Sequence, residues 1–355
     1  MLKVLFAGFK YEYGRKEWGL AGIEYRDFLG TLEKMPNVTV SFFAVDETMA
    51  KLGRDEMNKQ LVALVEDQKP DLLFTLLFED EIKKETINYI TRKTQTKTFN
   101  WFADDHWRLP VFSRYWAPLF TMVGTTDSEA PEKYRRLGIT NVIKTQWGVN
   151  QYVFKPQDNN NYNDKNNITF VGTDYGIRSK YVRGLIALGL PAQGFGKGFE
   201  GGKIDQQKMI EIFSVSKINL NFTESAYISF KQRMKLLAKM FIKKEQGKFK
   251  FAPNIISGLK SAAGARRRQI KGRNFDIPAC GGFLLTGDAD NLRAYYMPDK
   301  EIAIFSNFDE LAEKCKYYLE HPTERAAIAK AGYDRTIREH TYEQRFNEIF
   351  KKMGL

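Results

Sequence analysis

The sequence has few of the residues that build disulfide frameworks and metal centres. Only two cysteines, Cys280 and Cys315, occur among its 355 residues. A disulfide framework is therefore excluded, and a reducing compartment is expected. The three histidines, His106, His321 and His340, are far apart, and no Cys/His spacing resembles a structural zinc site. We therefore expect no bound metal.

Long hydrophobic runs and recognisable leader signals are also missing. No window approaches the roughly 20 apolar residues that cross a bilayer. The first eight residues, MLKVLFAG, form an apolar run that is too short for a signal peptide. The GxGxxG fingerprint of dinucleotide-binding proteins does not occur. We expect a cytoplasmic protein, either in solution or peripheral at the inner face of the membrane.

Short apolar runs alternate with helical patterns along the chain. Apolar runs predict buried parallel strands, among them 2–7, 71–78, 97–102, 168–171 and 283–286. Amphipathic patterns predict helices between them, among them 55–66, 81–92, 180–188 and 308–320. Strands that alternate with helices are typical of βαβ units and a parallel sheet.

The alternation is interrupted once, in an asparagine-rich stretch without aliphatic residues. Such a stretch cannot bury itself and is typical of a linker. We therefore predict an α/β protein of two Rossmann-like domains that face a central cleft. The predicted parts are an N-terminal domain at 1–154, a linker at 155–167, a C-terminal domain at 168–338 and a last helix at 339–355.

The positive charge is concentrated in one insertion of the second domain. The formal net charge is +12, and residues 227–273 hold fourteen Lys and Arg against one acid, Glu245. Apolar residues would share one face of a basic amphipathic helix there, namely Phe230, Met234, Leu237 and Phe241. Such a helix can bind an anionic membrane surface, bind nucleic-acid phosphates, or pack on its own domain with a solvated basic face. The sequence leaves these three interpretations open.

In the first domain, functional side chains concentrate in segment 100–108, NWFADDHWR, which follows a predicted strand. Functional groups of doubly wound sheets gather at the carboxyl ends of strands. His106 is a candidate catalytic group, and the carboxylate of Asp105 can orient it and raise its basicity. Trp101 and Trp107 could form a stacking platform for a sugar. Alternatively, the tryptophans belong to the core and the acids cap a helix.

The loop after the first strand, residues 8–22, contains four glycines, which let the backbone approach a ligand closely. Lys10 and Arg15 in this loop could contact a phosphate or an acidic acceptor. The alternative is an ordinary mobile loop.

In the second domain, VGTDYGIR at 171–178 has the order strand, glycine, helix start, which suits phosphate binding. Gly172 would let the backbone come close, and Arg178 and Lys180 supply positive charge. The stretch GFGKGFEGG at 194–202 is a second glycine-rich turn after a strand. Two such loops in one domain favour a ligand that carries phosphate.

Segment 271–286, KGRNFDIPACGGFLLT, is the most informative part of the chain. The carboxylate of Asp276 can accept two hydrogen bonds from a ribose diol. Alternatively, Asp276 caps a helix and Cys280 is a small buried side chain. Since Cys280 has no obvious histidine partner, we do not interpret it as a nucleophile. The remaining candidates here are Lys271 and Arg273 for phosphate, and Gly281 and Gly282 for close backbone contact.

Together these segments resemble the CgeB-like family of spore-maturation and glycosyltransferase-type proteins, with a group 1 glycosyltransferase C-terminal domain. The matching stretches span most of the chain and include NWFADDHWR, FVGTDYGIR, KGRNFDIPACGGFLLT and the tail KYYLEHPTERAAIAKAGYDRTIREHTYEQRF. The resemblance implies the GT-B fold, with the C-terminal helix crossing back to the first domain.

The resemblance also implies a metal-independent glycosyltransferase that uses a nucleotide-diphosphate sugar, UDP-linked, as co-substrate and needs no cofactor. Asp276 matches the acid that holds the ribose, although the family more usually has Glu there. Arg268 stands where the family has a second acid, eight residues earlier. The acceptor is unidentified, and the basic insertion suggests an anionic or membrane-associated one. The alternatives are a non-catalytic GT-B-like binding protein and a nucleic-acid-binding protein that acts through the insertion.

Overall fold

The computed structural model describes the chain apart from residues 158–166, 225–241, 246–247 and 252–254. The described residues form two compact units. The first unit comprises Met1–Gln146, the described part of 234–265, and Tyr342–Leu355. The second comprises the described parts of Trp147–Arg233 and of Arg266–Thr341. The helix face predicted from Phe230 to Phe241 and most of the predicted linker lie outside the described residues.

The first unit is built on a six-stranded parallel sheet with the order β2-β1-β3-β4-β5-β6. The strands are β1 (Leu2–Gly8), β2 (Val38–Ala44), β3 (Leu72–Thr75), β4 (Lys97–Phe102), β5 (Met122–Thr125) and β6 (Val142–Lys144). The central strands β3 and β4 are almost fully buried because helices cover both faces of the sheet.

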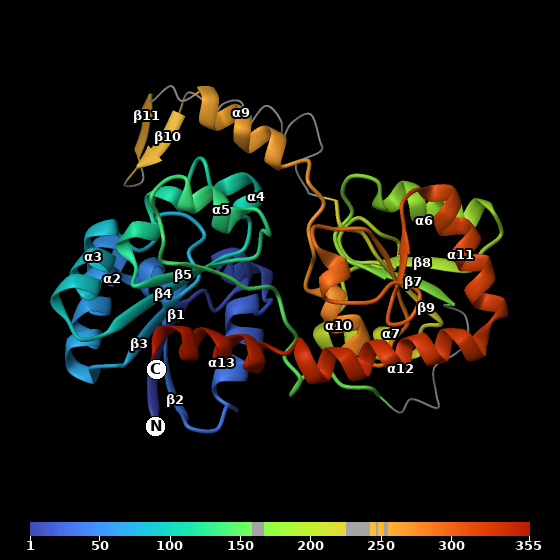
Figure 1. The fold of residues 1–355 in the computed structure, drawn as a ribbon, viewed down its shortest axis with the longest axis horizontal. Helices are drawn as coiled ribbons and strands as arrows, with labels where there is room; N and C mark the ends of the chain where they lie inside the picture. Colours follow the sequence, from blue (N-terminus) through green and yellow to red (C-terminus); the bar gives the residue numbers. More distant parts are fainter. Residues whose placement is uncertain (158–166, 225–241, 246–247, 252–254) are drawn as a thin grey trace. The chain divides into compact units, whose positions relative to one another are not determined.

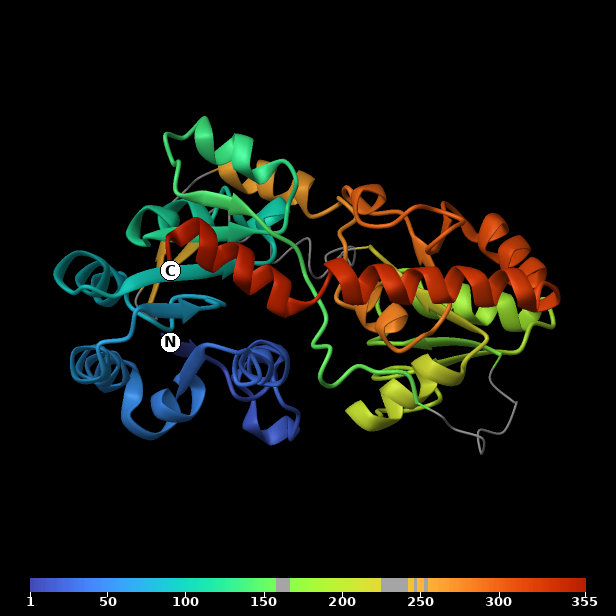
Figure 2. The ribbon, with the colours of Figure 1, turned by 60° about the horizontal axis from the view of Figure 1, so that its bottom comes forward.

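The helices of the first unit follow the strands in α/β order. They are α1 (Gly30–Leu32), α2 (Val45–Gln68), α3 (Lys84–Lys93), α4 (Asp105–Arg108) and α5 (Ala130–Arg135), with a π-helix at Glu24–Leu29 before α1. The C-terminal helix α13 (Tyr342–Met353) also packs in this unit (Figure 2). Its Tyr342 and Phe346 rings lie 4.8 and 5.4 Å from the ring of Phe28.

The described part of the basic insertion up to Ala265 packs with the first unit, and residues 266–273 belong to the second. The sequence analysis had placed the whole insertion in the second domain. The part in the first unit contains the antiparallel hairpin of β10 (Ile242–Glu245) and β11 (Lys248–Phe251), and helix α9 (Ile255–Gly264). Helix α9 lies beside α4 (Figure 1). Small residues allow this approach: a Cβ on Gly264 would come within 1.7 Å of the His106 carbonyl oxygen.

The second unit has a five-stranded parallel sheet with the order β13-β12-β9-β7-β8. Its strands are β7 (Ile168–Val171), β8 (Ala192–Phe195), β9 (Ile218–Asn221), β12 (Leu284–Gly287) and β13 (Ala303–Phe305). Its helices are α6 (Arg178–Ala187), α7 (Gln206–Val215), α10 (Arg273–Ala279), α11 (Phe308–Glu320) and α12 (Pro322–Glu339).

The N-terminal segment of the first unit ends at Gln146, eight residues before the predicted boundary at residue 154. The reason is that Val149 and Phe154 are fully buried in the core of the second unit. The N–H of Val149 also donates to the carbonyl oxygen of His340 at 3.0 Å. Residues 147–154 are therefore part of the second unit's packing.

Candidate functional site

In the second unit, two glycine-rich loops lie side by side at the carboxyl ends of β7 and β8. The N–H of Gly172 donates to the Phe195 carbonyl at 2.8 Å, and the N–H of Asp174 to the Lys197 carbonyl at 2.8 Å. Gly196 has φ +119°, and a Cβ there would lie 2.2 Å from the Gly172 carbonyl oxygen. Glycine is therefore required at Gly196 for the loops to meet.

The guanidinium of Arg178 holds the loop after β7 through several contacts. It donates to the carbonyl oxygen of Thr173 at 2.8 Å and to the Tyr175 hydroxyl at 2.5 Å, and it stacks 3.6 Å from the centre of the Tyr175 ring. Burial, together with the nearby charge of Arg273, lowers the pKa of Arg178 to about 10. Lys180 is exposed on the first turn of α6.

A buried amide cluster, which the sequence analysis missed, fixes the start of α10 against β9 and β12. The Asn274 side chain donates to the hydroxyl of Thr286 at 3.1 Å and accepts from the Asn221 amide at 3.0 Å and from the backbone N–H of Lys271 at 2.9 Å. The sequence did contain a signal for this cluster: asparagines alternate with aliphatic residues in the strand INLN, and a threonine ends the strand FLLT. The cluster places the half-buried Asp276 in the first turn of α10, near the ends of two central strands.

The turn between α10 and β12 has structural reasons for its two glycines. Gly281 adopts φ +74°, and a Cβ on Gly282 would come within 2.3 Å of the Phe213 carbonyl oxygen. Gly282 is buried, and packing against α7 is sufficient reason for a glycine at this position. Burial raises the pKa of the Cys280 thiol well above its usual range, so a reactive thiolate is disfavoured there.

The carboxyl ends of β9 and β12 border an open cleft of about 330 Å³, lined by Arg267, Arg268, Asp288, Ala289 and Asp290. Arg268, which stands at the position where the resemblance leads one to expect an acid, makes an ion pair with Glu224, with 3.4 Å between Nε and Oε1. The sequence analysis missed Glu224 because the pair joins residues far apart in the chain.

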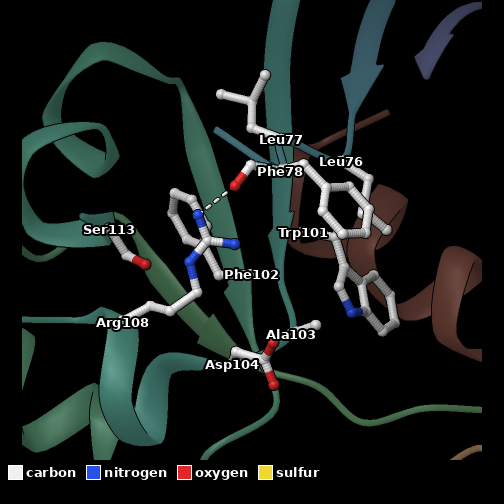
Figure 3. A pocket seen from close by; sticks show the side chains of 9 residues that line it. All are labelled: Leu76, Leu77, Phe78, Trp101, Phe102, Ala103, Asp104, Arg108 and Ser113. Carbon is white, nitrogen blue, oxygen red and sulfur yellow. Dashed lines mark hydrogen bonds between the residues drawn. The ribbon is translucent and has the colours of Figure 1, made fainter. Parts of the chain in front are cut away.

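In the first unit, a small pocket lies at the carboxyl ends of β3 and β4 (Figure 3). Asp104, Arg108 and Phe78 line it, and the Arg108 guanidinium donates to the Phe78 carbonyl oxygen. The pocket volume is about 40 Å³. A buried water needs ~10–15 Å³, so the pocket has room for a few waters but is too small for a sugar ring.

Asp105 and His106 lie in the interior, on α4. The Tyr134 hydroxyl donates to Asp105 Oδ2 at 3.0 Å, and burial raises the pKa of Asp105 to about 6. Trp101 is 0% exposed and packs edge-on against Phe28 at 5.1 Å between ring centres. Trp107 is buried as well. The rings predicted as a sugar platform are therefore core residues in this structure.

In the loop 8–22, Lys10 and Arg15 both have local contacts. Lys10 Nζ lies 3.2 Å from Glu47 Oε2, and the Lys10 backbone N–H donates to Asp46 at 3.0 Å. The Arg15 guanidinium lies 4.8 Å from the centre of the Trp18 ring. These contacts order the loop, and Arg15 remains on its exposed side.

Glu24, which the sequence analysis did not single out, is buried beside this loop. A Cβ on Gly22 would lie 2.8 Å from Glu24 Oε2, and one on Gly8 3.3 Å from its Cβ. Within the described residues, Glu24 Oε1 has no hydrogen-bond partner. Burial, together with the charges of Glu81 and Asp46, raises the pKa of Glu24 to about 8.

Two candidate sites therefore occur, each at the carboxyl edge of its own sheet. The edge in the second unit has the wider cleft, the clustered cations and Asp276. Among the described residues, no group of three His, Cys, Asp or Glu side chains is arranged to hold a metal ion. Within that same part of the chain, every helix is too short or too polar to span a bilayer.

Comparison with known proteins agrees with the fold. Residues 246–351 match a family described as glycosyl transferase-like. Spore protein CgeB of Bacillus subtilis (strain 168) is 23% identical over 291 residues, which cover 82% of this chain and 85% of CgeB. This match confirms the resemblance inferred from the sequence.

Three solved structures share the fold over nearly the whole chain. A glycosyltransferase from Rickettsia africae has a TM-score of 0.63 at 10% identity, covering 99% of this chain and 98% of that one. Sucrose-phosphate synthase from Thermosynechococcus elongatus has a TM-score of 0.61 at 10% identity, covering 99% of both chains. Anabaena HepE in complex with UDP has a TM-score of 0.56 at 12% identity, covering 99% of this chain and 100% of HepE. The family match over part of the chain, the similarity to CgeB and the two parallel α/β units together support a CgeB-like glycosyltransferase, and the solved structures show the GT-B fold.

Proposed function

We propose that this enzyme transfers a sugar from a UDP-linked donor, and that the second unit holds the donor. The observation that carries the proposal is the gathering of Asp276, clustered cations and two glycine-rich loops near the carboxyl ends of one parallel sheet. Ligands of open α/β sheets bind at this edge. The binding of UDP by HepE, which has a similar fold, supports uridine as the base.

Each donor group has a chemical partner in this proposal. The half-buried carboxylate of Asp276 accepts hydrogen bonds from the ribose hydroxyls. Arg273 and Lys271 neutralise the diphosphate, whose negative charge grows as the glycosidic bond breaks. Lys180 is exposed and available for the same charge, whereas the buried guanidinium of Arg178 acts mainly by holding the loop after β7. Positive side chains thus take the place of a metal ion.

His106 and Asp105 are the proposed catalytic pair on the first unit, next to the pocket at the carboxyl ends of β3 and β4. Asp105, with its pKa near 6, changes its charge within the range in which an acid–base group is useful. Because both side chains are buried, this role requires α4 to expose them when substrate binds. Lys10 and Arg15 are the proposed acceptor-side cations.

The acceptor is proposed to be anionic, because fourteen Lys and Arg lie within residues 227–273. On α9, exposed apolar side chains of Ile256 and Leu259 favour an acceptor that carries a lipid or lies at a membrane surface. The same charge would serve a nucleic-acid-binding protein, and a non-catalytic protein of this fold would bind donor without turnover. An assay of UDP release from UDP-glucose distinguishes these three possibilities. It is run without additions, with anionic lipid vesicles and with DNA.

The proposed donor is tested by thermal unfolding of the full chain with UDP, GDP, ADP and CMP. A ligand at a hundred times its dissociation constant stabilises the folded state by about 2.7 kcal/mol. We expect UDP to raise the melting temperature and the other three nucleotides to leave it unchanged. If GDP alone raised the melting temperature, the donor base would be guanine instead of uracil. If no nucleotide raised it, the proposed donor site would be contradicted.

A further inference from the structure

Glu224, just beyond the end of β9, has a buried carboxylate oxygen for which the described residues supply no partner. The residue is 9% exposed, and its Oε1 makes the long contact of 3.4 Å with Arg268 Nε. Its other oxygen, Oε2, is buried and has no hydrogen-bond partner among the described residues. A buried carboxylate oxygen that stays unpaired is costly, so this atom needs a donor that the described part of the chain does not supply.

The surroundings of Glu224 are held firmly by backbone contacts. The N–H of Gln269 donates to the Thr223 carbonyl at 3.1 Å, and the Thr223 hydroxyl donates to the Asp288 carbonyl at 2.7 Å. A further bond of 3.1 Å runs from the Asp290 N–H to the Arg268 carbonyl. The segment around Arg268 is thereby fixed between the ends of β9 and β12. Arg268 lines the open cleft, and the Glu224 carboxylate lies behind it, with Oε1 3.4 Å from Arg268 Nε.

The charges that face Glu224 restrict what its free oxygen can bind. Arg268 and Arg178 place positive charge near it, and the phenol of Tyr181 is also within electrostatic range. A phosphate would be repelled by the carboxylate itself. A metal cation would be repelled by the two arginines. A neutral hydroxyl group, which donates a hydrogen bond and carries no charge, fits this environment.

We propose that Glu224 binds hydroxyl groups of the transferred sugar, with Oε2 as the acceptor, and so selects the sugar of the donor. This inference rests on the proposed function, because it assumes that a nucleotide sugar enters the cleft of the second unit. It assigns the nucleotide and the sugar to different groups: Asp276 and the cations hold the nucleotide diphosphate, and Glu224 holds the sugar.

The test is calorimetric titration of the full chain with UDP and with UDP-glucose. In Glu224→Gln we expect the dissociation constant for UDP-glucose to rise by about tenfold or more, while that for UDP changes by less than about twofold. The ratio of the two constants is the decisive quantity, because loss of a merely structural ion pair would weaken both ligands together. Glu313→Gln, on the exposed side of α11, is the matched control and should change neither constant.

Glu224→Asp provides a second variant, which keeps the charge but withdraws the carboxylate by one methylene. It should give an intermediate ratio, and it carries the test if Glu224→Gln does not fold. An unchanged ratio in a folded variant overturns the role of Glu224 and leaves the proposed donor intact. Failure of the unmodified chain to bind either UDP or UDP-glucose overturns the proposed donor and this inference together.

Discussion

Replacing Trp101 by alanine is expected to lower the free energy of unfolding of the first unit by ~3–5 kcal/mol. Trp101 is 0% exposed, at the centre of the aromatic cluster that joins β4 to the C-terminal helix α13. Its removal would leave a cavity between Phe28 and Phe346, which lie 5.1 and 6.4 Å from it between ring centres. Denaturant unfolding, followed by the fluorescence of the remaining tryptophans, measures the change.

Trp18→Ala is the matched control for Trp101→Ala. Trp18 is 38% exposed in the loop 8–22, and we expect its loss to cost less than about 1 kcal/mol. If Trp101 acted mainly as a sugar platform, its replacement would weaken sugar binding and leave stability nearly unchanged. Equal stability of the two variants would therefore contradict the core position assigned to Trp101.

The second large effect concerns the buried carboxyl of Glu24 and the pH dependence of stability. Its pKa is raised to about 8 in the folded protein, first by burial and then by the charges of Glu81, Asp46 and Glu12. In the unfolded chain the carboxyl has an ordinary pKa near 4.3. Between about pH 4.3 and 8 the folded state therefore holds a proton that the unfolded state has lost. Unfolding releases this proton, so stability falls as the pH rises through that window.

Glu24→Gln removes this contribution because an amide does not titrate. One released proton changes the free energy of unfolding by about 1.4 kcal/mol per pH unit, so we expect the natural chain to lose about 2 kcal/mol between pH 6 and 8 through Glu24. The variant should lose correspondingly less. Measuring above pH 6 avoids most of the titration of Asp105, whose pKa is about 6.

Glu33→Gln, which changes an exposed carboxyl nearby in the chain, is the control and should keep the pH dependence of the natural chain. The raised pKa of the buried Glu81 contributes a slope of the same sign and remains in all three proteins. The account of Glu24 fails if Glu24→Gln loses as much stability as Glu33→Gln over this range.

Local patterns in the sequence were sufficient to predict much of the fold. The strand predicted at 97–102 has the same bounds as β4, and the apolar run at 168–171 is β7. The alternative interpretation of Asp276 placed it at the start of a helix, and it lies in the first turn of α10. Hydrophobic runs, glycines and turn residues act over a few neighbours, so these elements could be read from short windows.

Features that depend on distant contacts could not be predicted in this way. Nothing local indicates that α9 packs on α4, because the fit depends on Gly264 meeting the His106 backbone. The Glu224–Arg268 pair likewise joins two segments separated by the insertion. The tryptophan-rich segment 100–108 suggested a ligand site, but burial of Trp101 is decided by the arrival of the C-terminal helix α13.

The central claim, that Asp276 holds the nucleotide of a UDP-sugar, is tested most directly by titrating UDP into the natural chain and into Asp276→Ala. A hydrogen-bonded charged group contributes ~1.5–3 kcal/mol, so the variant should bind UDP at least about tenfold more weakly. Glu313→Ala should bind like the natural chain. Tight UDP binding by the natural chain that Asp276→Ala retains unchanged would contradict the claim.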